Sequence, residues 1–207
     1  MIRSRVTSRR AAAVALLAVA LSWLLAGPAR ADAPRAAAKV TLSDATLVDQ
    51  DGVQAKFRSA VIGDQIVVVD FVFTTCTTVC PVLTSIFARL QERLGDRLER
   101  GVRLVSVSLD PVRDTPARLK AYAAKYGAGP GWTWLTGKQE DVEVVLKGLG
   151  AYTPDFSAHS PMVLVGDGKS GAFTRFNGFP VQERIVEKVD ELLAARATTA
   201  SVQPERK

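Results

Sequence analysis

The chain has 207 residues, 47% of them hydrophobic, and its 27 lysines and arginines against 21 acids give a formal net charge of +6. Its first 31 residues hold five of the arginines and no acid, so the remainder has a net charge of +1 (6 minus 5). The basic balance is therefore no evidence for nucleic-acid binding. The roughly 175 residues that remain suit one domain with a sizeable core.

Residues 1–31 are typical of an export signal. A basic start precedes a mainly apolar run at 11–27 and a small-x-small cleavage site at 29–31. The basic residues are Arg3, Arg5, Arg9 and Arg10. Because the apolar run is at the lower limit for spanning a bilayer, a cleaved signal and an uncleaved N-terminal anchor both fit. Either one predicts an exported, extracytoplasmic (periplasmic) domain, preceded by an Ala/Pro-rich tether at 32–39.

The first elements expected after the tether are a hairpin, a central strand and a helix. Thr46–Val48 and Val53–Phe57 flank an Asp-Gly turn, which predicts an N-terminal β-hairpin. Ile66–Phe73 is a near-continuous β-branched and aromatic run, typical of a strand buried on both faces of a largely parallel sheet. The helix that follows has apolar residues along one stripe. These are Leu83, Ile86, Phe87, Leu90 and Leu94.

The rest of the chain alternates between strand and helix patterns. The expected elements are a strand at 102–109, a helix begun by Pro116 and capped by Asp114 or Thr115, a strand at 132–136, a helix closed by Gly150, a hairpin of 162–165 and 172–176, and a last helix ending at Ala195. Right-handed crossovers place helices on both faces of the sheet. The expected fold is a thioredoxin-like, three-layer α/β domain at 40–195 with a central mixed sheet, followed by a flexible tail at 196–207.

The only two cysteines, Cys76 and Cys80, lie where the central strand passes into a helix. The start of a helix favours thiolate over thiol. Four helical residues turn through about 400° and rise about 6 Å, so the two thiols would share a face and could form a disulfide or bind one ion. Thioredoxin-type motifs are one residue shorter. A structural disulfide remains an alternative, but so short a loop removes little unfolded-state entropy, which favours redox or metal chemistry.

His159 is the only histidine, and it lies in the loop at 152–161. A single loop histidine is more often a surface residue than a ligand, but in a thioredoxin-like fold this loop faces the helix with the dithiol. Two thiolates and an imidazole suit Cu(I), and the affinity order favours Cu(II) among divalent metals. Zinc with a water as its fourth ligand is the alternative metal. Asp110 could also lie near the site, although an Asp-Pro turn is its expected role.

Four segments resemble those of a known family in order and spacing. They are Phe73–Pro81, Ser108–Pro116, Trp134–Gly137 and His159-Ser160. Together they resemble the Sco/SenC family of copper chaperones, over roughly 40–193. The resemblance implies a thioredoxin-like fold and copper bound by Cys76, Cys80 and His159. It also implies delivery of that copper to the copper-centre subunit of cytochrome oxidase during assembly.

The histidine loop departs from the family pattern. Many members have an acid directly before the histidine, whereas this chain has Ala158, and Asp155 is the nearest acid upstream. A partner that orients the imidazole would then be missing or supplied elsewhere, which bears on affinity more than on ligand identity. Pro161 is also less usual, and it would suit the cis-proline position of thioredoxin-like folds.

Two classes of function remain open. One is a metallochaperone, and the other is an extracytoplasmic thiol-disulfide oxidoreductase that maintains the cysteines of a copper-site target, with Cys76 and Cys80 as its redox-active pair. His159 favours the first, because dithiol exchange needs no third ligand. A thiol-disulfide oxidoreductase is a further candidate partner. No nucleic-acid partner is expected, and a membrane is expected only through an N-terminal anchor.

Overall fold

The computed structural model describes residues 35–202, so the expected export segment lies outside the described residues. The described strands form one eight-stranded sheet in the order β1-β8-β7-β4-β5-β6-β2-β3. They are β1 (Arg35–Ala38), β2 (Thr46–Asp49), β3 (Gln54–Lys56), β4 (Ile66–Val72), β5 (Val102–Ser108), β6 (Trp132–Thr136), β7 (Met162–Asp167) and β8 (Phe173–Asn177). β4 is parallel to β5 and β5 to β6, but β4 is antiparallel to β7. The mixed sheet is therefore confirmed, and β4 is not set in a largely parallel one.

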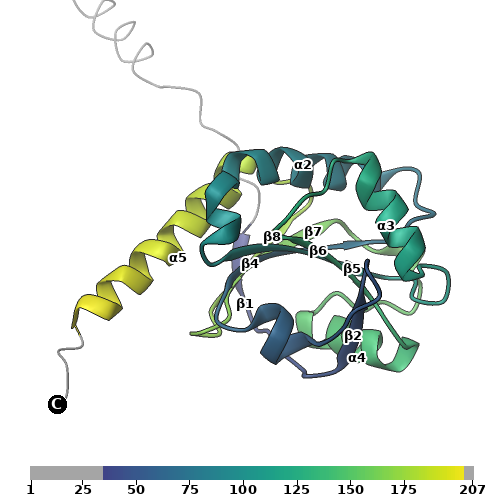
Figure 1. Cartoon of the computed structure of the whole chain (residues 1–207), viewed down its shortest axis with the longest axis horizontal. Helices are drawn as coiled ribbons and strands as arrows, with labels where there is room; N and C mark the ends of the chain where they lie inside the picture. The colour runs from purple at the N-terminus through teal and green to yellow at the C-terminus, as the bar shows by residue number, and fades with distance from the viewer. Residues whose placement is uncertain (1–34, 203–207) are drawn as a thin grey trace, which may run out of the picture. The chain divides into compact units, whose positions relative to one another are not determined.

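Helices cover both faces of this sheet, as Figure 1 shows. One face packs against α2 (Val79–Leu94), α3 (Pro116–Lys125) and α5 (Gln182–Val202). The other packs against α4 (Gln139–Leu149) and the π-helical turn η1 (Phe57–Ile62). Alternate residues of β4 enter the two cores, so all seven of its residues are buried. The three-layer α/β architecture is confirmed. Within residues 35–202, no helix is both long enough and apolar enough to cross a membrane.

The N-terminal hairpin is confirmed as the antiparallel pair β2 and β3. Its turn is closed by Asp49, whose Oδ1 accepts hydrogen bonds from the N–H groups of Asp51 and Val53, both at 2.9 Å. Gly52 occupies the left-handed position of the turn, with φ 84°. The chain then forms η1, which the sequence pattern did not indicate. This turn buries Phe57, Val61 and Ile62 against the sheet.

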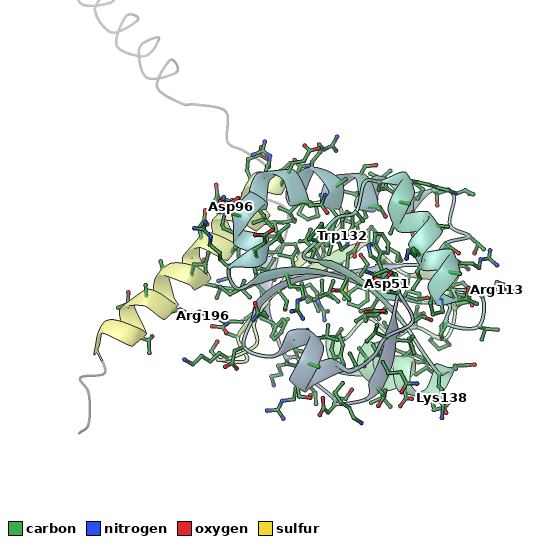
Figure 2. All side chains as sticks on the ribbon, in the orientation of Figure 1. Asp51, Asp96, Arg113, Trp132, Lys138 and Arg196 are labelled. Atoms are coloured by element: carbon green, nitrogen blue, oxygen red, sulfur yellow. The ribbon has the colours of Figure 1, made fainter. Side chains whose placement is uncertain are left out.

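Both ends of the domain extend further than expected. Residues 35–38 form β1, which pairs antiparallel with β8, because a sheet edge offers backbone groups that an alanine-rich segment can satisfy without large side chains. Likewise, α5 continues to Val202 beyond the expected end at Ala195. Arg196, labelled in Figure 2, donates hydrogen bonds from Nε at 3.2 Å and Nη2 at 2.5 Å to the nearly buried carboxylate of Asp167. Arg196 is thus part of the ordered helix.

Candidate metal centre

Cys76, Cys80 and His159 line one pocket at the end of β4, where the chain turns towards α2. The pocket has a volume of about 50 Å³. Its remaining lining residues are Phe71, Phe73, Thr78, Val79, Leu83, Leu109, Ser157 and Pro161. The structure therefore brings the three candidate ligand residues together, within largely apolar walls.

Cys80 lies in α2, but Cys76 does not, so the expectation of one shared helical face is wrong. The helix begins at Val79, and the side chain of its N-cap, Thr78, makes no capping hydrogen bond. Cys76 lies in the preceding turn, closed by a hydrogen bond of 3.1 Å from its N–H to the carbonyl oxygen of Phe73. The threonines on both sides of Cys76 are poor helix formers, which delays the start of the helix.

The sulfur of Cys76 takes the place of a capping oxygen. It accepts a hydrogen bond from the N–H of Cys80, with an N–S distance of 3.4 Å, and lies 3.9 Å from Thr78 Oγ1. Burial raises the pKa of the Cys76 thiol, but hydrogen bonds from the backbone N–H groups of Cys80 and Thr78 outweigh burial, so this pKa lies below its ordinary value. Cys76 is half-exposed and is the thiol that ionises more readily.

Cys80 has the opposite character. It is 4% exposed, and burial raises the pKa of its thiol far above the ordinary value, with further contributions from Cys76 and Asp70. Both cysteines are free thiols in this structure. The dithiol is therefore asymmetric, with one accessible sulfur that favours the thiolate and one buried sulfur that retains its proton.

His159 follows a short 3₁₀ turn, η3 (Phe156–Ala158), and its ring centroid lies 5.7 Å from that of Phe71. Burial lowers the pKa of its imidazole, which leaves the ring neutral near pH 7 and able to act as a ligand. Asp155 does not orient this ring, because its carboxylate accepts hydrogen bonds from Ser157 N–H at 2.9 Å and Ser157 Oγ at 2.6 Å. Asp155 therefore does not replace the acid that the family pattern places at position 158.

The three candidate ligands border the pocket without forming a closed cage. In the part of the chain that the structure describes, no three His, Cys, Asp or Glu side chains stand close enough to hold a metal ion as they are. The donor chemistry nevertheless fits a soft cation, since two sulfurs and one imidazole within apolar walls suit the low coordination number of Cu(I). Zinc would need a fourth ligand, such as water, to complete a tetrahedral set.

The structure confirms the expected role of Asp110 but not the expected conformation of Pro161. Asp110 is a turn residue, as expected, because its carbonyl oxygen accepts hydrogen bonds from the N–H groups of Arg113 at 3.1 Å and Asp114 at 2.9 Å. Its carboxylate accepts a hydrogen bond of 3.0 Å from Arg113 Nη1, and the residue lines a neighbouring pocket of about 190 Å³. Pro161 does line the pocket of the cysteines, but no peptide bond within residues 35–202 is cis. The cis-proline expectation is therefore wrong, and the bond has the intrinsically favoured trans form.

Asp70 is a buried acid beneath this end of the sheet that was not singled out from the sequence. Its Oδ1 accepts a hydrogen bond of 2.5 Å from Ser106 Oγ, which in turn accepts one of 3.0 Å from Trp132 Nε1. Among the described residues, Asp70 Oδ2 has no partner. Burial raises the pKa of Asp70 to about 7. The signal was visible as a single acid within the β-branched run of β4.

Asp114 was expected as a possible helix cap, but it contacts the cysteine loop instead. Thr115 caps α3 by accepting a hydrogen bond of 3.3 Å from Arg118 N–H. The Asp114 carboxylate accepts hydrogen bonds from Thr74 N–H and Thr74 Oγ1, two residues before Cys76. No local pattern predicts this contact, since 40 residues separate its partners.

The chain matches the SCO1/SenC family model over residues 34–194. A SCO1 protein homolog of Bacillus subtilis (strain 168) is 36% identical over 101 residues, which cover 47% of this chain and 50% of that protein. The matched stretch therefore spans about half the length of the curated relative. This comparison agrees with the resemblance noted in the four sequence segments.

Solved structures of Sco proteins are similar to this chain over a larger part of its length. BsSco, a member of the Sco family of cytochrome c oxidase assembly proteins that has a disulfide switch, is 27% identical with a TM-score of 0.64, over 75% of this chain and 95% of its own. Yeast Sco1 with copper bound is 22% identical with a TM-score of 0.62, over 76% and 95% of the two chains. These likenesses confirm the thioredoxin-like fold.

Proposed function

The chain belongs to the SCO1/SenC family, and from this premise we propose that it is a copper-binding metallochaperone that delivers copper during assembly of a cytochrome c oxidase copper centre. The observation that carries the proposal is that Cys76, Cys80 and His159 line the same, largely apolar pocket. Support also comes from relatives, since yeast Sco1 has been solved with copper bound and BsSco belongs to a family of oxidase assembly proteins.

The three proposed ligands have different roles. Cys76 is half-exposed and favours the thiolate, so it is the sulfur that meets incoming copper first. Cys80 is buried and protonated, so copper binding at its sulfur releases a proton. His159 supplies a neutral imidazole from the opposite loop, and this third donor matters more for Cu(II) than for Cu(I), which two thiolates hold well. Because protons compete for the sulfurs, copper affinity should fall as the pH falls.

The proposed recipient is the copper-centre subunit of cytochrome oxidase, and the proposed location is the extracytoplasmic side of the membrane. Residues 1–31 supply the export signal or anchor in this proposal. Cell fractionation and the N-terminal sequence of the mature protein test it. A cytoplasmic chain that retains Met1 would contradict export.

The substitution His159→Ala tests the function directly. It removes the imidazole and leaves both thiols, so Cu(II) should bind markedly more weakly and transfer to a copper-depleted oxidase subunit should fail. Titration of both copper oxidation states against wild type and variant measures this, with the exposed neighbour Ser160→Ala as the matched control. If His159→Ala binds and delivers copper as well as wild type, His159 is not a ligand. A wild type that delivers no copper would contradict the metallochaperone proposal.

A thiol-disulfide oxidoreductase is the second candidate, and one observation favours it. The pairing of an accessible Cys76 of lowered pKa with a buried Cys80 of raised pKa matches an attacking thiolate and a resolving thiol. Dithiol exchange does not need the imidazole, so a pure oxidoreductase should keep its exchange rate in the His159→Ala variant. A dithiol-exchange assay on the same two proteins, read together with their copper titrations, therefore separates the two functions.

A further inference from the structure

Asp114 joins three segments of the chain behind the cysteine pocket. Its side chain accepts hydrogen bonds from Thr74 N–H at 3.1 Å, from Thr74 Oγ1 at 2.5 Å and from Ser108 Oγ at 2.7 Å. Thr74 lies just after β4, Ser108 ends β5, and Asp114 precedes α3. Asp114 is only 1% exposed. One buried carboxylate thus satisfies three donors at the ends of two neighbouring strands.

Thr74 carries this constraint to the sulfur of Cys76. The turn that begins at Phe73 is closed by the hydrogen bond from Cys76 N–H to the Phe73 carbonyl oxygen. The Cys76 sulfur then meets the N–H of Cys80 at the start of α2, where the N-cap side chain makes no capping hydrogen bond. The place where Thr74 is held therefore determines where the Cys76 sulfur meets the helix.

We propose that Asp114 is a positioning residue for the cysteine pocket. By holding Thr74, it keeps the Cys76 sulfur against the start of α2 and so sets the copper affinity of the pocket and the dithiol-disulfide equilibrium of Cys76 and Cys80. Asp114 does not line the pocket and acts only through the loop. The copper part rests on the proposed function, whereas the dithiol part does not.

The physical basis is the strength of the contact and its closeness to the ligands. Hydrogen bonds to a buried carboxylate are short and roughly twice as strong as neutral ones. Groups that orient metal ligands without touching the metal change metal affinity by about 10- to 100-fold when they are removed. The Cys80 N–H donates its hydrogen bond to the reduced Cys76 sulfur, which is a better acceptor than a disulfide sulfur, so a loosened loop should favour the disulfide.

Three variants isolate the contact. Thr74→Val keeps the shape of the side chain and the backbone N–H, and it removes only the Oγ1 donor. Thr74→Ser retains that donor and serves as the conservative rescue. Asp114→Asn changes the acceptor itself, and Asp167→Asn is the matched control. Asp167 is also nearly buried and accepts backbone hydrogen bonds, from Lys169 and Ser170, but it pairs with the opposite end of β4.

Two measurements are made on the purified protein. The first is Cu(I) affinity of the reduced protein, by competition with a chelator. The second is the equilibrium with glutathione, in which the two thiols lose two electrons and two protons and form one Sγ–Sγ bond, while one glutathione disulfide gains them and yields two glutathione thiols. Thermal unfolding of each variant shows that it is folded.

Thr74→Val should weaken Cu(I) binding about tenfold and shift the glutathione equilibrium towards the protein disulfide about fivefold. Asp114→Asn should change both in the same direction, and Thr74→Ser should remain near wild type. Asp167→Asn should lower thermal stability without changing either measurement. If Asp114→Asn does not fold, the Thr74→Val and Thr74→Ser pair decides.

The proposal is overturned if Thr74→Val and Asp114→Asn change the glutathione equilibrium no more than Asp167→Asn does. In that case Asp114 has a structural role alone. A wild-type protein that binds no copper would instead contradict the proposed function. The glutathione measurement would still decide the role of Asp114, so the two failures are distinguishable.

Discussion

The two loops that border the pocket are held in different ways. The cysteine loop at 73–80 is tied by hydrogen bonds to a buried carboxylate and to the start of α2. The histidine loop at 152–161 has backbone hydrogen bonds to the rest of the fold at its two ends, from Tyr152 N–H to the Leu146 carbonyl oxygen and from Gly178 N–H to the Pro161 carbonyl oxygen. Between these ends it is held by hydrogen bonds within itself and by two ring contacts. These are Phe156 with Phe73 at 5.1 Å and His159 with Phe71 at 5.7 Å between centroids. Because ring contacts are less directional than buried hydrogen bonds, we expect the imidazole to adjust during copper binding while the dithiol stays fixed.

Oxidation of the two thiols to a disulfide should have the largest effect. It tests whether the cysteine loop contributes more to copper binding than the histidine loop does. We expect the reduced protein to bind one copper per chain and the disulfide form to bind little, because only thiolates are ligands. Metal analysis after desalting measures this in reduced and oxidised samples. A Cys80→Ser variant, which cannot form the internal disulfide, serves as the control for oxidation. Equal copper in the reduced and oxidised wild type would remove Cys76 and Cys80 from the site.

The second prediction concerns Asp70, the buried acid in β4, which is the strand that precedes the cysteine loop. Because burial raises the pKa of Asp70 from 3.8 to about 7, the folded chain retains a proton between these pH values that the unfolded chain has lost. The resulting stabilisation is complete below about pH 4 and is lost as the pH rises through about 7. A difference of about three pH units at about 1.4 kcal/mol each corresponds to about 4 kcal/mol.

Urea unfolding of the reduced wild type and Asp70→Asn from pH 4 to 8 measures this loss. The wild type should lose stability relative to the variant as the pH rises. Asp167 should behave in the opposite way, because burial raises its pKa but hydrogen bonds from Arg196 and backbone N–H groups lower it more. Its stabilisation should be present at neutral pH and lost on acidification. Parallel pH profiles for wild type and Asp70→Asn would show that Asp70 is solvated.

A smaller effect is expected from loosening the histidine loop. Phe156→Ala removes the edge-to-face contact with Phe73, which is worth about 0.5–1.5 kcal/mol beyond its area. Cu(II) affinity should fall by roughly fivefold, while the dithiol-exchange rate should stay near that of wild type. Ser160→Ala, at an exposed position in the same loop, is the control. An equal loss in dithiol exchange would show that the two loops are not independently held.

The smallest effect is expected from restoring an acid before the histidine. Ala158 is exposed, so an Ala158→Asp carboxylate would act through solvent, and its effect should be about 0.5 kcal/mol, or roughly a twofold gain in Cu(II) affinity. Isothermal titration at low and high salt measures this, and the gain should diminish as salt screens the charge. Asn at the same position is the uncharged control. A gain that salt leaves unchanged would indicate direct contact with the imidazole or the metal.

The strands and helices of the domain were predictable because their side-chain periodicity reports local burial. The run that forms β4 lacks a polar face because two cores cover it, and the spacing of apolar residues in α2 follows its buried stripe. The boundaries were less predictable. β1 depends on backbone pairing with β8, and the last turns of α5 include Arg196, which binds the distant carboxylate of Asp167. Neither contact can be predicted from the local pattern of side chains.

The sequence by itself determined the candidate ligands Cys76, Cys80 and His159, because residue types with so few copies leave little choice of soft donors. It also indicated that the cysteines lie at a strand-to-helix junction. Only the tertiary structure decided that Cys76 precedes α2, that the dithiol is asymmetric, and that Asp114 holds the loop from a distant segment. The reason is physical: donor chemistry belongs to the residue, whereas burial, proton affinity and hydrogen-bond partners depend on which distant segments the fold brings together.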